Sequence, residues 1–341
     1  MTDASSQSTT RTPLVSVVMP VFNAEATVTE AVQSILSSSL TDLELVVVND
    51  GSTDDTVALI NSIQDPRITL IHQDHAGVSD AHNLGISHSR ADYIARMDGD
   101  DIASPDRLGK QLELLLQESC DIVSCRVAIT DLEGNPIDSL RRYENWSNAL
   151  LSTEEILAHR FVESPLVHPT TLARREVWEL GCRKGPFPED YDFWLRAFAA
   201  GYRPIKHPDV LLQWRDRPER LTRTAEQFTR EAFDRCRKEH LLIGPLNDMA
   251  KVDFWGVGQS GKPWVRWIQS KGISIRHLVD VHPRKIGTRI LDVDVISPDQ
   301  LPSPDGTPLL VAVGAEGARE LIEDHLLAKG HRPGRDAWFL C

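Results

Sequence analysis

The first half of the chain repeats one pattern, a short apolar run followed by a stretch with apolar residues at helical spacing. The apolar runs cover residues 16–22, 43–48, 68–72, 93–97 and 121–129. Unbroken runs of this length suit strands that are covered on both faces, and the intervening helices suit a mainly parallel sheet. In such sheets, ligands bind at the loops that follow the carboxyl ends of the strands. The sequence therefore predicts an α/β fold.

Helix signals separate the apolar runs. Apolar side chains recur at helical spacing from Val28 to Leu36, and Asn23 is the expected N-cap of this helix. Ser52 or Thr53 is expected to cap a second helix, because acidic residues follow in its first turn. The alternation of strand and helix therefore continues beyond the second run.

Length and charge narrow the class of protein. The chain has 341 residues, 41% hydrophobic and 26% charged, so it can bury a core and is long enough for two domains. Its net charge of −13 excludes non-specific binding to nucleic acid, which requires a basic surface. No apolar run approaches the roughly 20 residues that span a bilayer. Five scattered cysteines lack the spacing of a zinc site. We therefore expect reduced thiols in a cytoplasmic protein without a transmembrane segment.

The chain divides into four expected segments. Residues 1–12 are rich in Ser and Thr and should form a flexible tail, and residues 13–224 should form the first α/β domain. Residues 225–249 are expected to be a polar helical linker that contains a Gly-Pro pair. Strand and helix patterns restart in residues 250–341, which predicts a second, smaller α/β domain.

The densest acidic motif follows the fourth apolar run. Asp98, Asp100 and Asp101 surround a glycine, and three carboxylates in one folded loop repel one another unless a cation compensates them. Hard oxygen ligands suit Mg²⁺ or Mn²⁺, which retains waters and binds a substrate diphosphate. A solvated acidic turn explains the same residues, because Asp-Gly is a common turn pair. The motif alone leaves both interpretations open.

Two further acidic segments lie at expected element ends. Asp50 follows the second apolar run, where a carboxylate can accept hydrogen bonds from a base or ribose. Glu189 and Asp190 precede an aromatic-rich amphipathic helix, where one carboxylate could act as a general base. A helix start with an acidic first turn explains most of either segment, so neither decides the function by itself.

The order of these motifs is far more specific than any one of them. Together they make the sequence resemble glycosyltransferase family 2, the inverting transferases with a GT-A fold. The matching segments are residues 16–23, 46–54, 77–85, 93–101 and 189–196. The resemblance covers roughly residues 13 to 220, which makes residues 13–224 a GT-A domain and leaves the last third unexplained.

The resemblance implies a donor site. The residues implied to bind the nucleotide sugar are Pro20, Val21, Phe22, Asn23, Asp50, Asn83 and Asp98. Among them, Asp50 would contact the base, often uracil, and Asp98 the ribose. One departure is His82, because Arg often precedes the asparagine that matches Asn83. The contact that this arginine would make is therefore not expected.

The resemblance also implies catalytic groups. Asp98 and Asp100 would hold Mg²⁺ or Mn²⁺, with Asp100 the more direct ligand, and Asp190 would be the general base. Glu189 is a further candidate beside that base. His168 could approach the diphosphate or the metal, and Arg215 lies where family members often close the site. A structural histidine and a solvated arginine are simpler interpretations of these last two residues.

The implied reaction is the inverting transfer of a sugar from a nucleotide-diphosphate donor to a hydroxyl group. A UDP-sugar is the expected donor, and the expected acceptor is a cell-envelope glycan or a lipid-linked molecule. The protein would then work in the cytoplasm or peripherally at the inner membrane face. A nicotinamide-dependent oxidoreductase and a non-catalytic nucleotide-sugar sensor are the alternatives.

The last third carries an independent motif. Gly256, Gly258 and Gly261 form Gly-x-Gly-x-x-Gly after an expected strand, and Asp280 ends the next strand. This spacing formally completes a dinucleotide-binding fingerprint. Roughly 90 residues are too few for a full dinucleotide domain together with a substrate domain of its own. We therefore expect a Rossmann-like accessory domain rather than an NAD enzyme.

Overall fold

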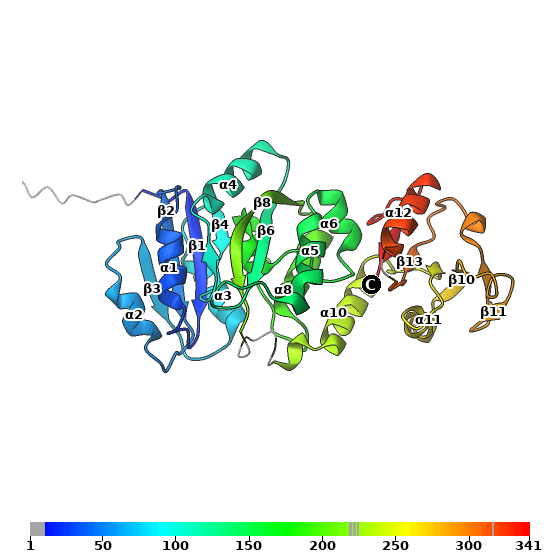
Figure 1. Ribbon diagram of the computed structural model, residues 1–341, viewed down its shortest axis with the longest axis horizontal. Helices are drawn as coiled ribbons and strands as arrows, with labels where there is room; N and C mark the ends of the chain where they lie inside the picture. Colours follow the sequence, from blue (N-terminus) through cyan, green and yellow to red (C-terminus); the bar gives the residue numbers. More distant parts are fainter. Residues whose placement is uncertain (1–10, 218–219, 221–222, 224, 316) are drawn as a thin grey trace, which may run out of the picture. The chain divides into compact units, whose positions relative to one another are not determined.

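The structure, a computed structural model, describes residues 11–217, 220, 223, 225–315 and 317–341. The chain forms two compact units (Figure 1). The first comprises Met1–Asn148, Val167–Arg183 and Lys206–Arg217, and the second comprises Ala149–Leu166, Lys184–Ile205 and Pro218–Cys341. These units are interleaved in sequence, whereas each predicted domain is one continuous segment. That residues 13–224 and 250–341 form separable domains therefore stays a prediction. Within the described residues, no helix is both long and apolar enough to cross a membrane.

An eight-stranded sheet forms the centre of the first unit. Its strand order is β3-β2-β1-β4-β7-β6-β8-β5. The strands are β1 (Val15–Val21), β2 (Leu43–Asn49), β3 (Ile68–His72), β4 (Tyr93–Arg96), β5 (Ile102–Ala103), β6 (Ile122–Thr130), β7 (Leu172–Arg174) and β8 (Pro204–Arg215). Strands β3, β2, β1 and β4 run parallel, whereas β7 is antiparallel to both β4 and β6, and β5 to β8. The five predicted strand runs are therefore confirmed.

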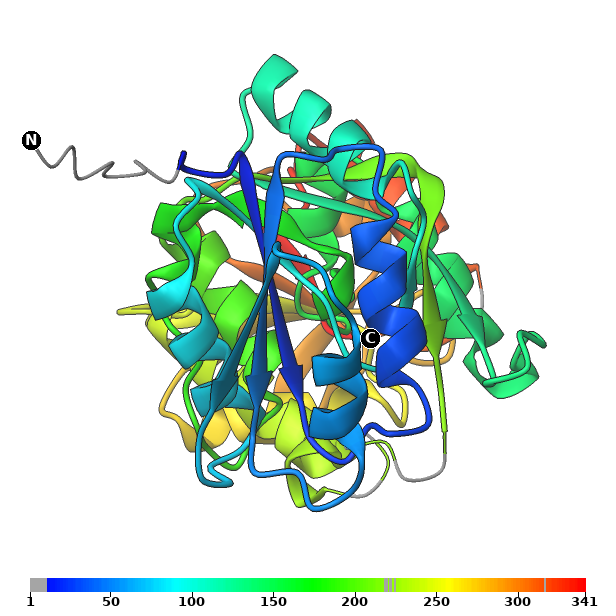
Figure 2. The ribbon, with the colours of Figure 1, turned by 90° about the vertical axis from the view of Figure 1, so that its left-hand side faces the viewer.

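Helices cover both faces of the parallel strands. They are α1 (Val28–Leu36), α2 (Thr56–Ser62), α3 (Val78–His88), α4 (Arg107–Gln117), α5 (Arg141–Ala149) and α7 (Arg175–Trp178), with 3₁₀ turns η1 (Asp138–Leu140) and η2 (His168–Thr170). Figure 2 shows the strands between α1 on one side and α3 on the other. Every residue of β1 and β2 is buried, which explains why these strands are continuous apolar runs rather than alternating ones.

The two predicted helix caps are wrong. The N-cap residue of α1 is Thr27, and that of α2 is Asp55. Asn23 instead adopts a left-handed backbone with φ of 48° and accepts a hydrogen bond from Thr53 N at 2.9 Å. The Ser52 hydroxyl accepts the Asn23 N–H at 3.0 Å. These side chains therefore join the loops after β1 and β2, a long-range role that competes with helix capping.

The second unit contains a six-stranded sheet of its own. Its order is β11-β12-β10-β9-β13-β14, and all neighbours except the β11–β12 pair are parallel. The strands are β9 (Lys251–Trp255), β10 (Ser274–Val279), β11 (Arg289–Ile290), β12 (Val293–Ile296), β13 (Leu309–Val311) and β14 (Ala337–Phe339). The connections from β9 run outward on both sides, so the strand order reverses between β9 and β13 as in doubly wound nucleotide-binding sheets.

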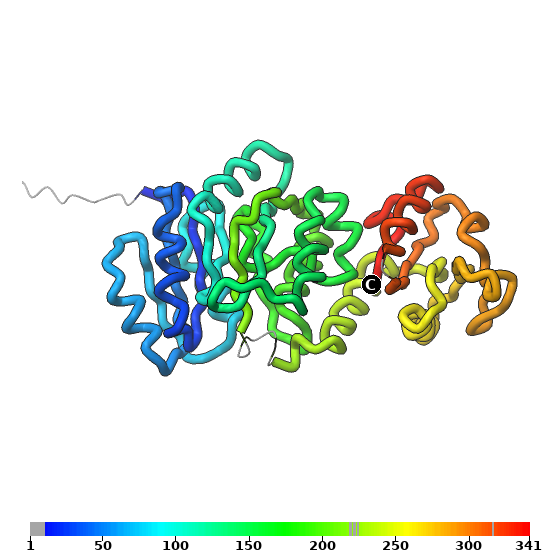
Figure 3. Tube along the Cα trace, viewed as in Figure 1, coloured from blue at the N-terminus to red at the C-terminus, as the bar shows by residue number. Residues whose placement is uncertain are grey.

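Helices from distant parts of the chain belong to the second unit. They are α6 (Thr153–His159), α8 (Glu189–Ala199), α10 (Arg230–Ile243), α11 (Gly261–Ser270) and α12 (Ala318–Ala328), with 3₁₀ turns η3 (Glu226–Phe228) and η4 (Pro298–Gln300). Figure 3 traces the earlier helices in green and the later ones in yellow to red. The predicted linker segment contains a helix, since α10 begins at Arg230 after the short turn η3, and its role as a linker stays a prediction.

One hydrophobic core joins these early and late segments. Phe161, Tyr191 and Leu195 pack in the same cluster as Phe254 and Trp338. Tyr191 is fully buried, and its hydroxyl donates a hydrogen bond to Arg160 O at 2.7 Å. The aromatic face of α8 therefore packs on residues from the last third of the chain.

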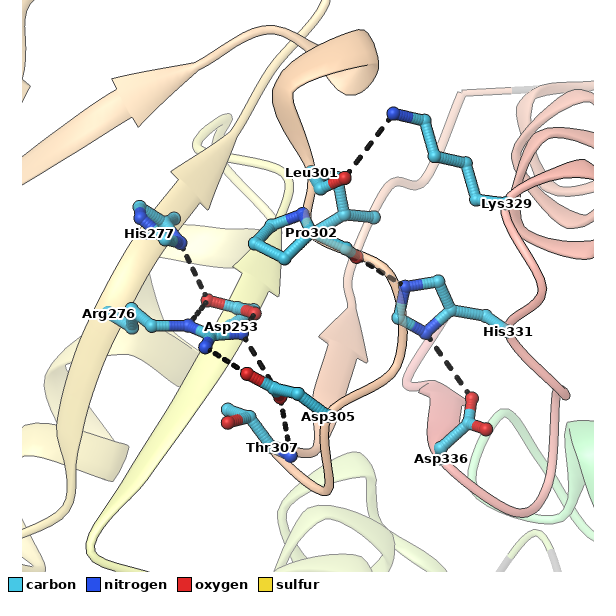
Figure 4. Close-up of polar contacts among 10 residues, drawn as sticks. All are labelled: Asp253, Arg276, His277, Leu301, Pro302, Asp305, Thr307, Lys329, His331 and Asp336. Carbon is cyan, nitrogen blue, oxygen red and sulfur yellow. Dashed lines mark hydrogen bonds and ion pairs between the residues drawn. The ribbon is translucent and has the colours of Figure 1, made fainter.

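A polar network joins β9 and β10 to the loop before β13 (Figure 4). Arg276 binds Asp253 through two hydrogen bonds of 3.0 and 2.5 Å and reaches Asp305 at 2.6 Å. Asp253 is 2% exposed, and His277 Nδ1 lies 3.1 Å from its Oδ1. Because a buried carboxylate requires such partners, this network explains how an aspartate is accommodated in β9.

Candidate active site

The Asp50 carboxylate organises the loop between β3 and α3. Its Oδ1 accepts hydrogen bonds from Ala76 N at 2.8 Å and Gln73 Nε2 at 2.6 Å, and its Oδ2 accepts one from Gly77 N at 2.9 Å. Asp50 is 3% exposed, so these bonds replace water around a buried charge. The predicted position of Asp50 at the carboxyl end of β2 is confirmed, and its observed partners are protein groups.

An aromatic pair lies beside this loop. The rings of Phe22 and His75 stack with centroids 4.2 Å apart, and His75 Nδ1 lies 3.0 Å from Asp50 Oδ2. Phe22 is 43% exposed, whereas its neighbours Pro20 and Val21 are buried in β1. Such an exposed ring next to a hydrogen-bonding loop can stack with a planar base. Sequence analysis missed His75, although its place just after β3 was an available signal.

The acidic loop follows β4 and presents two partly exposed carboxylates. The side chains of Asp98 and Asp100 are 23% and 12% exposed, whereas Asp101 is fully buried. One oxygen atom from each of the three lies within 4.8 Å of the others. Asp101 Oδ1 accepts the Arg215 N–H at 2.9 Å, so this third carboxylate has a structural role.

Cations and backbone bonds hold the loop in place. Arg96 donates to Asp98 Oδ1 at 2.8 Å, and Arg217 Nε lies 3.6 Å from Asp100 Oδ2. Arg215 Nε donates to the carbonyl oxygen of Asp100, and the Thr27 hydroxyl donates to that of Gly99 at 2.9 Å. A Cβ at Gly99 would lie 2.8 Å from the Val21 side chain, so the close approach of the loop to β1 favours glycine.

The donor atoms of this loop fit a hard divalent cation. Asp98 and Asp100 offer carboxylate oxygens that are close together and reach solvent, as Mg²⁺ or Mn²⁺ requires. Asp98 is the more constrained of the two, because Arg96 contacts its Oδ1 through both Nε and a terminal nitrogen. The Asp100 carboxylate lies 3.6 Å from Arg217 Nε, a longer separation than that between Asp98 and Arg96.

Three other predicted residues are committed to internal contacts. Arg215 is 2% exposed and reaches Glu30 at 2.5 Å in addition to the acidic loop. The Asn83 amide binds the backbone of Cys182 through bonds of 2.8 and 2.9 Å. His168 is 8% exposed and packs against His82 and Trp178. The structure thus places each of them in a supporting position within the first unit.

The predicted base lies in the second unit, in the first turn of α8. Asp190 and Glu189 are both half-buried, and Gln227 donates to Glu189 Oε2 at 3.1 Å. Asp192, two residues further on, is buried and binds Arg196 at 2.8 Å and His240 at 3.0 Å. The helix therefore carries one buried acid, Asp192, and two half-buried acids at its N-terminus, Glu189 and Asp190.

A carboxyl group that sequence analysis missed lies near this helix. Burial raises the pKa of Glu163; the Arg237 charge opposes this shift, and the charges of Asp190 and Asp234 add to it. Its position in an irregular segment gave no recognisable signal. The electrostatic effect shows that Glu163 and Asp190 are neighbours within the second unit.

The glycine motif of the last third has clear steric roles. Gly256 has φ of 108°, and a Cβ there would lie 2.5 Å from Ala312 O. A Cβ at Gly261 would meet Gly256 O at 1.8 Å, whereas one at Gly258 would meet nothing within 4 Å. Asp280 follows β10 and binds Lys285 Nζ and His282 N, both at 2.8 Å. Two of the three glycines are therefore explained by packing alone.

Comparison with solved structures identifies the class of fold. Residues 1–349 of S. aureus TarS, solved in complex with UDP-GlcNAc, superimpose with a TM-score of 0.54 at 18% sequence identity, covering 67% of this chain and 66% of that one. The same protein solved with UDP gives a TM-score of 0.51. The sheet with acidic loops at the carboxyl ends of its parallel strands is thus the GT-A fold of nucleotide-sugar transferases.

Sequence comparison gives the family. The model of glycosyl transferase family 2 matches residues 16–181, and this part of the chain belongs to that family. An uncharacterized glycosyltransferase of Haemophilus influenzae is 26% identical over 282 residues, covering 73% of this chain and 83% of the relative. The putative glycosyltransferase EpsE of Bacillus subtilis is 29% identical, covering 69% of this chain and 85% of the relative. The chain is therefore a glycosyltransferase enzyme.

Other relatives match a smaller share of their length. The chondroitin synthase of Escherichia coli is 31% identical over 210 residues, but the match covers 28% of that protein. A second Haemophilus influenzae glycosyltransferase is 38% identical over 128 residues, and the chain spans about half of its length, 51%. The last third of the chain lies outside the family match.

Proposed function

We propose that the protein is an inverting glycosyltransferase that moves a sugar from a UDP-sugar to a hydroxyl group of a cell-envelope glycan or lipid-linked acceptor. The observation that carries this proposal is the acidic loop after β4, where Asp98 and Asp100 present neighbouring carboxylates at the carboxyl edge of a family 2 domain. A glycan acceptor is supported by relatives whose names state glycan synthesis, such as chondroitin synthase.

The nucleotide binds, in this proposal, over the loops after β1, β2 and β3. Phe22 and His75 form the stacking surface for the base, and Asp50 fixes the loop that carries His75. Asn23 joins the loops after β1 and β2 through Thr53. UDP is preferred as the nucleotide because TarS, which shares the fold, was solved with UDP-GlcNAc.

The diphosphate lies, in this proposal, over the acidic loop. Asp98 and Asp100 would hold Mg²⁺ or Mn²⁺, which would supply positive charge against the charge that grows on the departing diphosphate. Arg96 and Arg217 already compensate part of the carboxylate charge. Arg107 and Thr27 fix the backbone of the loop, so the carboxylates are positioned before the donor arrives.

Asp190 is the proposed general base. Its carboxylate takes the proton of the acceptor hydroxyl as that oxygen attacks the anomeric carbon from the face opposite the diphosphate. The bond between the anomeric carbon and the diphosphate oxygen breaks, and its electron pair leaves with the diphosphate. The configuration at the anomeric carbon is therefore inverted. Asp190 is half-buried in the N-terminal turn of α8.

The proposal is tested with purified protein, a panel of UDP-sugars and an acceptor panel, in Mn²⁺, Mg²⁺ or EDTA. We expect UDP release that depends on the metal. Asp190→Asn should lower kcat by about 10²–10⁴-fold with little change in donor affinity, because a base acts on the acceptor rather than on the nucleotide. Asp131→Asn changes a carboxylate in an exposed turn and is the matched control.

Two results would contradict the assignment. An unchanged rate for Asp190→Asn would remove Asp190 as the base. Full activity of Asp100→Asn in Mn²⁺, or of the wild-type protein in EDTA, would remove the metal from the mechanism.

The nicotinamide alternative receives no support from these observations. The matched relatives are glycosyltransferases, and Asp280, the residue that a dinucleotide ribose would need, is bound by Lys285. Asp280 also accepts the Val257 N–H at 3.4 Å.

A further inference from the structure

A cluster of nitrogen and sulfur donors lies in the first unit, outside the acidic loop. His82 of α3, His168 of η2 and Cys182 of the loop after α7 come from three segments of the chain. One donor atom of each lies within 4.8 Å of the other two, and Cys182 Sγ is 3.4 Å from His82 Nδ1. All three residues are buried, with exposures of 1%, 8% and 8%.

His82 is incompletely satisfied by protein partners. Its Nε2 is buried and has no hydrogen-bond partner among the residues that the structure describes. The edge of Trp178 packs against the ring with centroids 5.0 Å apart and excludes water from that side. A buried polar nitrogen without a partner is costly and rare in native proteins, so its presence needs an explanation.

We propose that His82, His168 and Cys182 form a binding site for Zn²⁺ or a similar borderline transition metal, with these three residues as its ligands. Two imidazoles and one thiolate are a ligand set that zinc uses and that Mg²⁺ avoids. Cys182 Sγ lies 3.4 Å from His82 Nδ1, and the Nε2 that lacks a partner among the described residues is the other nitrogen of the same ring, so the thiol lies beside the imidazole that would bind the metal.

The surroundings hold the ligands in place. The side-chain amide of Asn83, next to His82 on α3, binds the backbone N–H and C=O of Cys182 at 2.8 and 2.9 Å. These bonds fix the thiol loop against the helix that carries the first imidazole. Such supporting contacts orient metal ligands and strengthen binding.

Charges around the site are compatible with a bound cation. Arg96 is the nearby positive group that acts on both histidines, and its guanidinium is bound to Asp98 at 2.7 and 2.8 Å. Burial lowers the pKa of His82 and brings that of His168 to about 3. Both imidazoles are therefore neutral at pH 7, the form that donates a lone pair to a metal.

The inference is independent of sugar transfer. A metal at this site would join α3 to the segments before and after β7 and brace the first unit behind the acidic loop. Its soft ligand makes it chemically distinct from the proposed Mg²⁺ or Mn²⁺ site. A spectroscopic test can therefore separate the two.

The test is a Co²⁺ titration of the full, reduced chain after removal of bound metal with a chelator. We expect one equivalent to bind with a thiolate-to-cobalt charge-transfer absorption, and Zn²⁺ to displace it while excess Mg²⁺ does not. Cys182→Ser should abolish this absorption. His82→Gln should weaken Co²⁺ binding by at least about tenfold, because one of three protein ligands is lost.

Three controls separate the site from others. Cys120→Ser removes another buried thiol of the first unit and should leave the absorption unchanged. Asp100→Asn should also leave it unchanged, because a carboxylate site gives no thiolate absorption. Circular dichroism of each metal-free variant shows whether it folds, and a thermal shift of the wild-type chain with Zn²⁺ gives a reading without mutation.

The proposal is overturned if the folded wild-type chain gives no thiolate absorption with Co²⁺ and no thermal shift with Zn²⁺. It is also overturned if the absorption survives in Cys182→Ser, or is lost in Cys120→Ser. In either case a simple hydrogen bond between Cys182 and His82 would account for the cluster.

Discussion

Arg107 is a buried cation that binds the backbone just before the acidic loop. Its guanidinium is fully buried and donates to Arg96 O at 2.6 Å, to Gln111 Oε1 at 3.0 Å and to Met97 Sδ at 3.3 Å. Arg96, whose carbonyl oxygen accepts the first of these bonds, ends β4 and binds Asp98 through its side chain. Arg107 is therefore a positioning residue for the proposed metal ligands.

Replacing Arg107 should destabilise the protein. Arg107→Met leaves the buried Arg96 carbonyl without its donor, which should lower the free energy of unfolding by about 2–3 kcal/mol. Lys110→Met, on the same helix, removes a solvent-exposed ion pair with Asp209 and should lower the free energy of unfolding by much less than Arg107→Met does. Urea unfolding of both variants measures the difference, and equal losses would contradict the assigned role.

Lys206 gives a pH dependence that can be measured. Burial lowers its pKa to about 7, and its ammonium donates to Ser147 O at 2.5 Å. An unfolded lysine keeps its proton to a much higher pH, so between pH 7 and 9 the unfolded state binds more protons. Stability attributable to Lys206 should therefore rise with pH, by about 2 kcal/mol across this window.

The matched variant for this prediction is Lys206→Met, which has no such titration. From pH 7 to 9, the free energy of unfolding of the wild type should increase relative to that of Lys206→Met. The window ends there because the Cys125 thiol, whose pKa burial raises to about 11, acts in the opposite direction above pH 9. A difference that does not change with pH would show that Lys206 stays charged.

The positions of the acidic residues could be predicted from the sequence, but those of their partners could not. Asp50, Asp98 and Asp100 follow strands as predicted, because apolar runs show where parallel strands end. The Gln73–Gly77 segment that binds Asp50 has no motif, and its backbone N–H groups carry no sequence signal. Their pairing depends on the fold, so it could not be read from the sequence.

Among the helices, α6 has the most complete N-terminal cap. Ser152 accepts the Glu155 N–H at 3.2 Å, and Glu155 accepts the Ser152 N–H at 2.8 Å. This reciprocal capping box satisfies two backbone donors that would otherwise lack partners.

Removing the cap should destabilise α6. Ser152→Ala should lower the free energy of unfolding by about 1 kcal/mol, the usual cost of losing a serine N-cap. Ser87→Ala, which removes an exposed hydroxyl in the last turn of α3, is the control and should change stability by less than about 0.5 kcal/mol. A neutral Ser152→Ala would mean that tertiary packing alone holds the start of α6.

Elements with strong local patterns were predicted, and short ones were not. The long runs of β1, β2 and β6 read clearly because both faces are buried. Strands β7 and β14 have only three residues each, too few to show a period. Their existence depends on pairing with distant strands, which local sequence does not specify.

In the whole molecule, the two units are interleaved along the chain, so domains predicted as continuous segments do not describe them. Phe161, Tyr191 and Leu195 lie inside the region that resembles the transferase family, yet they share a core with Phe254 and Trp338. Apolar residues show that a core exists, but not which distant segments complete it. The helix that carries Asp190 is thus built on the last third of the chain.

Truncation tests this arrangement. A fragment of residues 1–249 lacks the partners of Phe161, Tyr191 and Leu195, so it should expose apolar surface, bind the dye ANS and aggregate. The full chain, prepared in parallel, should do neither. A monomeric, cooperatively folded fragment with full transferase activity would instead support the predicted boundary, with an accessory domain that separates cleanly.

The interleaved core also sets an order of events during synthesis. All segments of the first unit have been synthesised once Arg217 is made, whereas α8 must wait for Trp338 and Leu340 before its apolar face is covered. At about 5–20 residues per second, the remaining hundred or so residues take on the order of ten seconds. During that interval the nascent α8 exposes aromatic side chains, and chaperones that recognise such surfaces have time to bind it.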